Sequence, residues 1–231
     1  MIRITVLICA LALAGCVDTA PTPTASAPQA APPRLDARLA AQNFAAVVRS
    51  VEPVAERECR ARAPRLDCDF RIVVDDRPGQ PPNAYQTEDG SGRPVIAFTL
   101  PLIAEARNRD ELAFVMGHEA AHHISGHLNR TRQTAILGAV ILGSLASAAG
   151  VEDPSLAQDI GATVGARTYS KDYELEADSL GTIIAYRAGY DPLRGAAFFD
   201  RIPDPGNRFL GTHPPNASRK ATVQNTLARL R

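Results

Sequence analysis

The chain has 231 residues, of which 45% are apolar and 22% are charged, values typical of a globular protein. This length suits one well-packed domain and does not require two. The 25 Lys and Arg residues balance the 25 Asp and Glu residues, so the formal net charge is zero. Because nucleic-acid binders usually carry a basic excess, we expect no nucleic-acid partner.

Residues 1–15 have the pattern of a lipoprotein signal peptide. Arg3 supplies the positive start, and the apolar run 4–13 is too short to span a bilayer comfortably. The run leads into Leu13-Ala14-Gly15-Cys16, which resembles the lipobox of bacterial lipoproteins, where cleavage precedes a cysteine that is then acylated. We therefore expect lipidation at Cys16, with a plain secretory signal and a chance cysteine as the alternative.

The residues after Cys16 predict where the chain resides. Val17 follows the cysteine where an aspartate would favour retention at the inner membrane. By resemblance to Gram-negative sorting rules, we expect a lipid-anchored protein of the bacterial cell envelope, at the outer membrane and facing the periplasm. Residues 16–34 are rich in Pro, Ala and Thr and predict a flexible tether. Residues 35–231 then form the folded domain.

The remaining cysteines predict a disulfide. Cys9 lies in the signal and Cys16 is expected to carry lipid, which leaves Cys59 and Cys68. An isolated pair in an exported protein is typical of a disulfide. The enclosed loop is short, so its entropic stabilisation would be about 2–3 kcal/mol.

Next along the chain come a helix and a small sheet. Apolar residues at helical spacing predict a helix over 35–61, which Pro53 kinks or interrupts. Runs of apolar and β-branched residues then predict about three strands, the last two joined by a turn at 88–92. The predicted strands are 70–74, 83–87 and 94–99.

The rest of the chain reads as helical. Asp110 is the expected N-cap of a helix from Glu111 to about Ser125. The seventeen residues 134–150 carry no charge and reach the lower limit for a membrane span. Their Ser and Gly content favours a buried or interfacial helix instead. Further helices are predicted at 101–106, 155–167, 170–189, after Asp191-Pro192, and at 221–230.

Four of the five histidines fall within ten residues, which favours a metal site. His118-Glu119-Ala120-Ala121-His122 is an HExxH motif. Residues four apart share one helix face, so both imidazoles can point at one ion, while Glu119 can reach a water on that ion. His123 lies off this face. Because HExxH also recurs by chance, an ordinary helix with two surface histidines is the alternative.

A third ligand is expected on a later helix. Zinc needs another protein ligand and an open position for water. A metzincin would have histidine six residues after His122, but that position is Leu128. Glu174 and Asp178 share a helix face, so Glu174 can complete the metal triad. Asp178 can then accept a hydrogen bond from the far nitrogen of a ligand histidine. A solvated acidic helix face is the alternative.

Several further motifs occur in a fixed order along the chain. They are Asn83-Ala84-Tyr85, 110–119, His127, 174–178, and His213-Pro214 with Arg219. Taken together, these motifs resemble the gluzincin metallopeptidases of the HtpX and CAAX-prenyl-protease type, including their compact minigluzincin relatives. The resemblance covers most of the chain after about residue 35. Membrane-embedded relatives have several spans, and this chain has no convincing one, so prenyl-protein substrates are not expected.

The resemblance implies a fold and a set of roles. The fold is α+β: a mainly helical, zincin-like (minigluzincin) domain with a roughly three-stranded sheet beside the HExxH helix. One Zn²⁺ per chain would be held by His118, His122 and Glu174. Glu119 would be the general base, with His213 or Arg219 stabilising the oxyanion, or His213 capping the zinc. Asp178 and His127 would support the ligands, and Asn83, Ala84 and Tyr85 would bind substrate.

The function so implied is a zinc-dependent endopeptidase that degrades misfolded or stalled cell-envelope proteins. Its partners would be unfolded or misfolded proteins, the membrane through the N-terminal lipid, and an envelope assembly complex. The alternative is a lipoprotein chaperone or outer-membrane assembly factor with a latent or structural zinc site.

Overall fold

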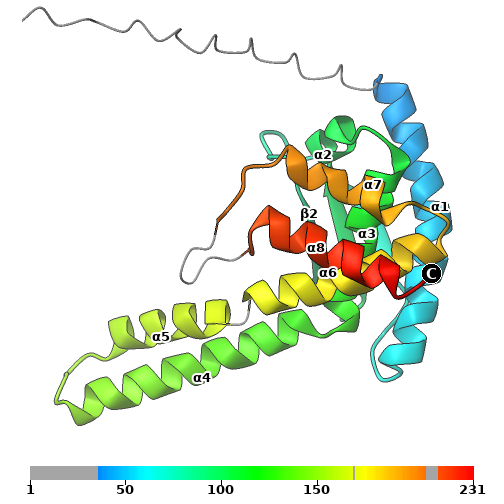
Figure 1. Cartoon of the computed structure of the whole chain (residues 1–231). Helices are drawn as coiled ribbons and strands as arrows, with labels where there is room; N and C mark the ends of the chain where they lie inside the picture. Colours follow the sequence, from blue (N-terminus) through cyan, green and yellow to red (C-terminus); the bar gives the residue numbers. More distant parts are fainter. Residues whose placement is uncertain (1–35, 169, 207–212) are drawn as a thin grey trace, which may run out of the picture. The chain divides into compact units, whose positions relative to one another are not determined.

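The computed structural model describes residues 36–231 except 169 and 207–212 (Figure 1). The expected signal at 1–15, the tether at 16–34 and the lipidation site Cys16 lie outside the described residues. The division of the chain into these segments and a folded domain therefore stays a prediction.

The sheet has three strands in the order β1-β3-β2. The central strand β3 (Pro94–Thr99) pairs in parallel with β1 (Arg71–Asp75) and antiparallel with β2 (Ala84–Glu88). All six residues of β3 are buried, as expected for a central strand with neighbours on both sides. The strand β2 lies at an edge of the sheet.

The long first helix, α1 (Ala37–Arg62), closes one side of the core. Its N-cap is Asp36, whose carboxylate accepts hydrogen bonds from the backbone N–H groups of Arg38 and Leu39. Pro53 lies inside the helix and does not end it. The predicted disulfide is confirmed: Cys59, near the end of α1, is bonded to Cys68, just before β1.

The core lies between α1, the sheet, α3 (Arg109–Ile124) and α6 (Ser170–Arg187). The short helix α2 (Leu100–Glu105) follows β3 and adds Leu102 and Ile103 to this core. The mainly helical α+β prediction with a small three-stranded sheet is confirmed. The largest fully buried apolar side chains of the core include Phe70, Ile96, Phe98, Met116 and Ile184.

The start of α3 corrects one expectation. Asn108 is the N-cap, because its side-chain oxygen accepts a hydrogen bond from Glu111 N at 3.0 Å. The prediction of Asp110 as N-cap was wrong. Asp110 lies in the first turn, where it accepts a hydrogen bond from the backbone N–H of Asp191 at 3.0 Å.

The helices α4 (His127–Ala148) and α5 (Ser155–Thr168) form an antiparallel hairpin that extends away from the sheet (Figure 1). Only His127 and Gly143 of α4 are buried, so the expectation of a buried helix over 134–150 was wrong. The alternative, an interfacial helix, stays open. Among the described residues, no helix is both long enough and apolar enough to cross a membrane.

The C-terminal part packs beside α3 and α6. The helix α7 (Pro192–Ala196) begins after its N-cap Asp191, as predicted, and continues into the 3₁₀ helix η1 (Ala197–Asp200). The last helix, α8 (Asn216–Ala228), begins five residues before the predicted start. Asn216 is buried, and its amide donates to the carbonyl oxygen of Phe199 at 2.9 Å.

Candidate metal centre

Two helices bring the predicted ligands together: His118 and His122 lie on α3, and Glu174 lies on α6. The helices approach closely because two glycines face each other. A Cβ on Gly117 would lie 2.8 Å from the carbonyl oxygen of Gly181, and a Cβ on Gly181 would lie 2.7 Å from the backbone nitrogen of His118. This contact sets the carboxylate within reach of both imidazoles.

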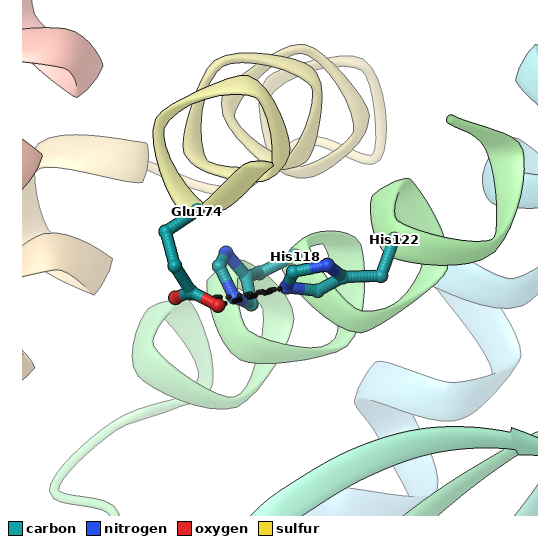
Figure 2. A group of neighbouring side chains, drawn as sticks. All are labelled: His118, His122 and Glu174. Carbon is teal, nitrogen blue, oxygen red and sulfur yellow. Dashed lines mark hydrogen bonds and ion pairs between the residues drawn. The ribbon is translucent and has the colours of Figure 1, made fainter. Parts of the chain in front are cut away.

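The three side chains converge on one point (Figure 2). His118 Nε2 and His122 Nε2 are 3.0 Å apart. Glu174 Oε2 lies 3.5 Å from His118 Nε2, and Glu174 Oε1 lies 3.4 Å from His122 Nε2. Ligand atoms around a tetrahedral zinc with bonds of about 2.0–2.1 Å are separated by about 3.3 Å. The spacing of these three side chains therefore fits a zinc ion.

The state of Glu174 also fits a cation. Its Oε2 atom is buried and accepts no hydrogen bond, although side-chain nitrogens lie within ion-pair distance. Burial alone would raise the pKa of this carboxyl, but the neighbouring imidazoles of His118, His122 and His213 hold the pKa well below its usual value. A metal ion would supply the missing partner of this buried, ionised carboxylate oxygen.

Behind the cluster, Asp178 and Arg219 hold His118. The buried Asp178 places Oδ1 3.0 Å from His118 Nδ1, so the other ring nitrogen is left to face Glu174. Arg219 donates to both oxygens of Asp178, at 2.7 and 2.6 Å. Burial lowers the pKa of His118, but Asp178 and Glu174 outweigh it and raise the pKa to about 10. The structure thus brings Asp178 to the predicted position behind a candidate ligand.

His127 supports the second imidazole. Its Nδ1 lies 2.8 Å from His122 Nδ1, and its Nε2 lies 3.1 Å from Glu176 Oε2. The ring stacks on Tyr173 with centroids 4.6 Å apart. Sequence reasoning missed Glu176 and Tyr173, although they stand two residues after and one before Glu174. Tyr173 and Glu176 are three residues apart and share a face of α6, but no local pattern indicates that His127 packs against that face.

His213 and Glu119 lie on the open side. His213, in the segment before α8, places Nδ1 3.1 Å from Glu174 Oε2, and its side chain is 54% exposed. Arg219 Nη2 lies 3.4 Å from the same oxygen but is buried. Glu119 is half-buried and lines the cleft above the cluster. The structure therefore brings together all the residues predicted to act in catalysis.

The cluster opens into a cleft of about 720 Å³. The edge strand β2 forms one wall, where Asn83, Ala84 and Tyr85 all line the cleft. The hydroxyl of Tyr85 donates to Asp75 Oδ2 at 3.0 Å, which ties its ring to the sheet. Aromatic and aliphatic side chains line much of the rest: Leu102, Phe114, Val115, Phe198, Phe199 and Ile202.

His123 takes no part in the cluster. Its Nε2–H donates to the carbonyl oxygen of Asp67 at 2.7 Å, and its ring packs edge-on against Phe70. This agrees with its expected position off the ligand face. The contact instead connects α3 to the disulfide-closed loop between α1 and β1.

An HExxH helix, a carboxylate from a second helix and an open cleft beside an edge strand define a peptidase of the metal-dependent class. Comparison with known families agrees, since the model of peptidase family M48 matches residues 41–227. The chain belongs to this family. The predicted metallopeptidase relationship is confirmed at this level, and the finer likeness to the HtpX and CAAX-prenyl-protease type stays a prediction.

Individual relatives point the same way. The chain is 29% identical over 139 residues to the beta-barrel assembly-enhancing protease of Escherichia coli, covering 54% of this chain and 28% of the relative. It is 28% identical over 134 residues to the protein of that name in Yersinia pestis, covering 51% and 27%. It is 27% identical over 133 residues to the mitochondrial metalloendopeptidase OMA1 of Arabidopsis thaliana, covering 54% and 26%. The match thus spans about a quarter of each relative.

Proposed function

We propose that this protein is a zinc-dependent endopeptidase that degrades misfolded or stalled proteins of the cell envelope. The observation that carries the proposal is the convergence of His118, His122 and Glu174 at the floor of an open cleft. Family membership supports the reaction class. The compact arrangement supports placement among the minigluzincins, with residues 35–231 as the catalytic domain.

The site residues divide the chemistry. His118, His122 and Glu174 would hold one zinc ion, which supplies Lewis acidity that lowers the pKa of a water towards about 7 and polarises the scissile carbonyl. Glu119, beside the cluster, accepts the proton and delivers it to the leaving amine. Asp178 keeps His118 in one orientation, and His127 does the same for His122.

His213 is the better placed of the two candidates for oxyanion stabilisation. Arg219 is buried and uses both Nε and Nη2 to bind Asp178. His213 stands at the exposed side of Glu174 and can donate to a developing oxyanion or cover the metal. A His213→Ala variant separates these roles: a fall in proteolysis indicates oxyanion stabilisation, and a rise indicates a cap.

The cleft suits an extended polypeptide. A substrate segment can add to the edge strand β2 beside Asn83, Ala84 and Tyr85 through main-chain hydrogen bonds, which select weakly for sequence. Unfolded proteins would be cut and folded ones spared. Relatives named beta-barrel assembly-enhancing protease favour an envelope assembly complex as partner. A lipid on Cys16 would keep the enzyme at the outer membrane, facing the periplasm.

The test compares Glu119→Gln with wild type for zinc content and casein hydrolysis. We expect the variant to keep one zinc per chain and to lose hydrolysis by at least about 10³-fold, because the proton acceptor is gone. Glu152→Gln, an exposed glutamate between α4 and α5, is the matched control and should behave as wild type. Hydrolysis that survives in Glu119→Gln would reject the mechanism.

The chaperone or assembly-factor alternative gives a different result. It predicts that purified wild-type protein holding zinc suppresses aggregation of an unfolded client without cutting it. Glu119→Gln would then be as active as wild type. Chelator-sensitive cleavage of casein by wild type, absent from Glu119→Gln, would exclude this alternative.

A further inference from the structure

The hairpin of α4 and α5 carries most of the exposed large apolar side chains among the described residues. Several are more than half exposed, including Leu137 at 58%, Leu145 at 61% and Leu156 at 70%. An apolar surface of this kind on a projecting element marks a binding surface.

The hairpin is packed with small residues inside and large residues outside. A Cβ on Gly138 would collide with the carbonyl oxygen of Gly161, and a Cβ on Gly165 would collide with that of Thr134. Water-soluble helix pairs bury their large apolar side chains between the helices. Helices that pack in lipid instead place glycines at the contact and turn Leu, Ile and Val outward. This hairpin has the second arrangement.

Six of the exposed apolar residues of α4 and α5 lie on one flank of the hairpin, and Ile136 and Val140 are exposed outside this set. Ile141 and Val164 each stand three residues after a contact glycine, Gly138 and Gly161 respectively. In antiparallel helices, residues with the same offset from the contact lie on the same side. The contact between Gly143 and Gln158 marks the opposite side. We call the first side the apolar flank; it consists of Leu137, Ile141, Leu145, Leu156, Ile160 and Val164.

Charge is absent from most of this surface. No Asp, Glu, Lys or Arg occurs between Arg132 and Glu152. Helical spacing places Asp159 away from the apolar flank, while Arg167 lies at the end of α5 nearer the metal centre. Lipid contact along the flank would therefore desolvate no charged side chain over most of its length.

We propose that the apolar flank lies in the interfacial region of a lipid bilayer, with the hairpin parallel to the membrane surface. Helices that lie in the interfacial region bury their apolar side about 5–10 Å deep. An acyl anchor at Cys16, proposed above, would be joined to α1 by residues 17–35, which reach at most about 65 Å when extended. A tether of that reach would hold the folded domain within about 65 Å of the bilayer, where the apolar flank can meet lipid.

This contact would place the metal centre at the membrane surface. Leu128 and Thr131, in the first turns of α4, line the cleft that holds His118 and Glu174. A docked hairpin would therefore present the cleft to polypeptides at the bilayer. This consequence rests on the proposed peptidase function, whereas the docking itself does not.

The test labels neighbouring positions of the full-length chain. Cys9→Ser and Cys16→Ser remove the other thiols, since Cys59 and Cys68 are joined in a disulfide. A single cysteine is then introduced as Ile160→Cys or as Asp159→Cys and labelled with NBD. These adjacent residues lie at the same distance along α5, and both are exposed. The apolar leader is present in both chains, so vesicle attachment through it affects both labels alike.

The labelled chains are mixed with phosphatidylcholine vesicles that contain doxyl-labelled lipid. We expect a blue-shifted emission at position 160 and quenching at least about threefold stronger than at position 159. Ile141→Cys, on the apolar flank of α4, should behave like Ile160→Cys. Zinc binding by each labelled chain checks that the metal centre is intact, and its loss would bear on the proposed function alone.

Four outcomes would overturn the proposal. Equal or absent quenching at both positions would show that the flank does not meet lipid. Quenching that requires anionic lipid would indicate headgroup attraction instead of apolar contact. A blue shift without vesicles that grows with protein concentration would identify a second copy as the occupant. A blue shift that appears only with unfolded casein would identify a polypeptide.

Discussion

Two helix pairs in this protein share the same close glycine contact, but their large side chains point in opposite directions. Between α3 and α6, Gly117 and Gly181 bring backbones together so that charged side chains meet in a buried cluster. Between α4 and α5, Gly138 and Gly161 bring backbones together, and the large side chains face outward. Close glycine contacts therefore do not by themselves indicate a buried site; what the neighbouring side chains do decides the role of the pair.

The largest expected effect comes from the carboxylate in the first pair. Glu174→Gln keeps the size of the side chain but removes its negative charge, so zinc affinity should fall at least about 100-fold and hydrolysis should be lost. Metal titration and casein cleavage measure the two effects. Glu152→Gln serves as the control, and wild-type zinc affinity in Glu174→Gln would remove Glu174 from the ligand set.

Replacing a contact glycine with alanine should have different effects on stability in the two helix pairs. Gly181→Ala sets a methyl group against the backbone of His118, which costs about 3 kcal/mol. Higher helix propensity returns about 1 kcal/mol, so the free energy of unfolding should fall by about 2 kcal/mol. Urea unfolding and metal titration measure this change.

Gly138→Ala is the matched change in the hairpin. Its helices have little core to hold them together, so they can move apart. We expect a change in the free energy of unfolding within about 1 kcal/mol and unaltered zinc affinity. If both alanine variants lost zinc equally, the two contacts would be coupled and the contrast between them would fail.

The pH dependence of the free energy of unfolding reports on His127, which contacts the candidate ligand His122. Burial, opposed by the hydrogen bond to Glu176, lowers the pKa of His127 from 6.5 to about 4. Between these values the folded state binds fewer protons than the unfolded state, so the free energy of unfolding falls as the pH drops through this window. We expect His127 to account for a loss on the order of 1 kcal/mol between pH 7 and pH 5.

Comparing urea unfolding of wild type with His127→Gln isolates this contribution. The variant cannot titrate at position 127, so its stability should depend less steeply on pH in the same window. Parallel curves for the two proteins would show that position 127 does not titrate between pH 7 and pH 5.

The smallest effect is expected on the outside of the hairpin. Val140→Ser should change the free energy of unfolding by no more than about 0.5 kcal/mol, because Val140 is 59% exposed. The same change at Val47, fully buried in α1, should cost at least about 2 kcal/mol. Urea unfolding compares them. A large loss for Val140→Ser would mean that the hairpin packs against another part of the chain.

Local patterns pointed to the side chains that the structure brings together at the candidate metal centre. HExxH spacing places His118 and His122 on one helix face, and the spacing of Glu174 and Asp178 does the same for the carboxylates. The sheet also followed from its apolar runs and the turn at 88–92. Each of these spacings and runs is local, although the structure then joins α3 to α6 and β1 to β3 across longer stretches of chain.

Features set by tertiary contacts were harder to predict. The N-cap of α3 was one such feature. Asp110 does not cap α3, because its carboxylate accepts a hydrogen bond from Asp191, the N-cap of α7. An uncharged run such as 134–150 does not reveal whether its surroundings are protein, solvent or lipid, so the sequence left a buried and an interfacial helix as alternatives. The contacts of Tyr173 and Glu176 likewise depend on where α4 begins.

The bond between Cys59 and Cys68 has a consequence for how the protein must be prepared. It closes the loop in which Asp67 accepts a hydrogen bond from His123, on the helix that also bears His118 and His122. Material made in a reducing cytosol would lack this disulfide, and His123 of α3 would then contact a loop that is no longer held closed. Assays of metal content and turnover therefore call for protein matured under oxidising conditions.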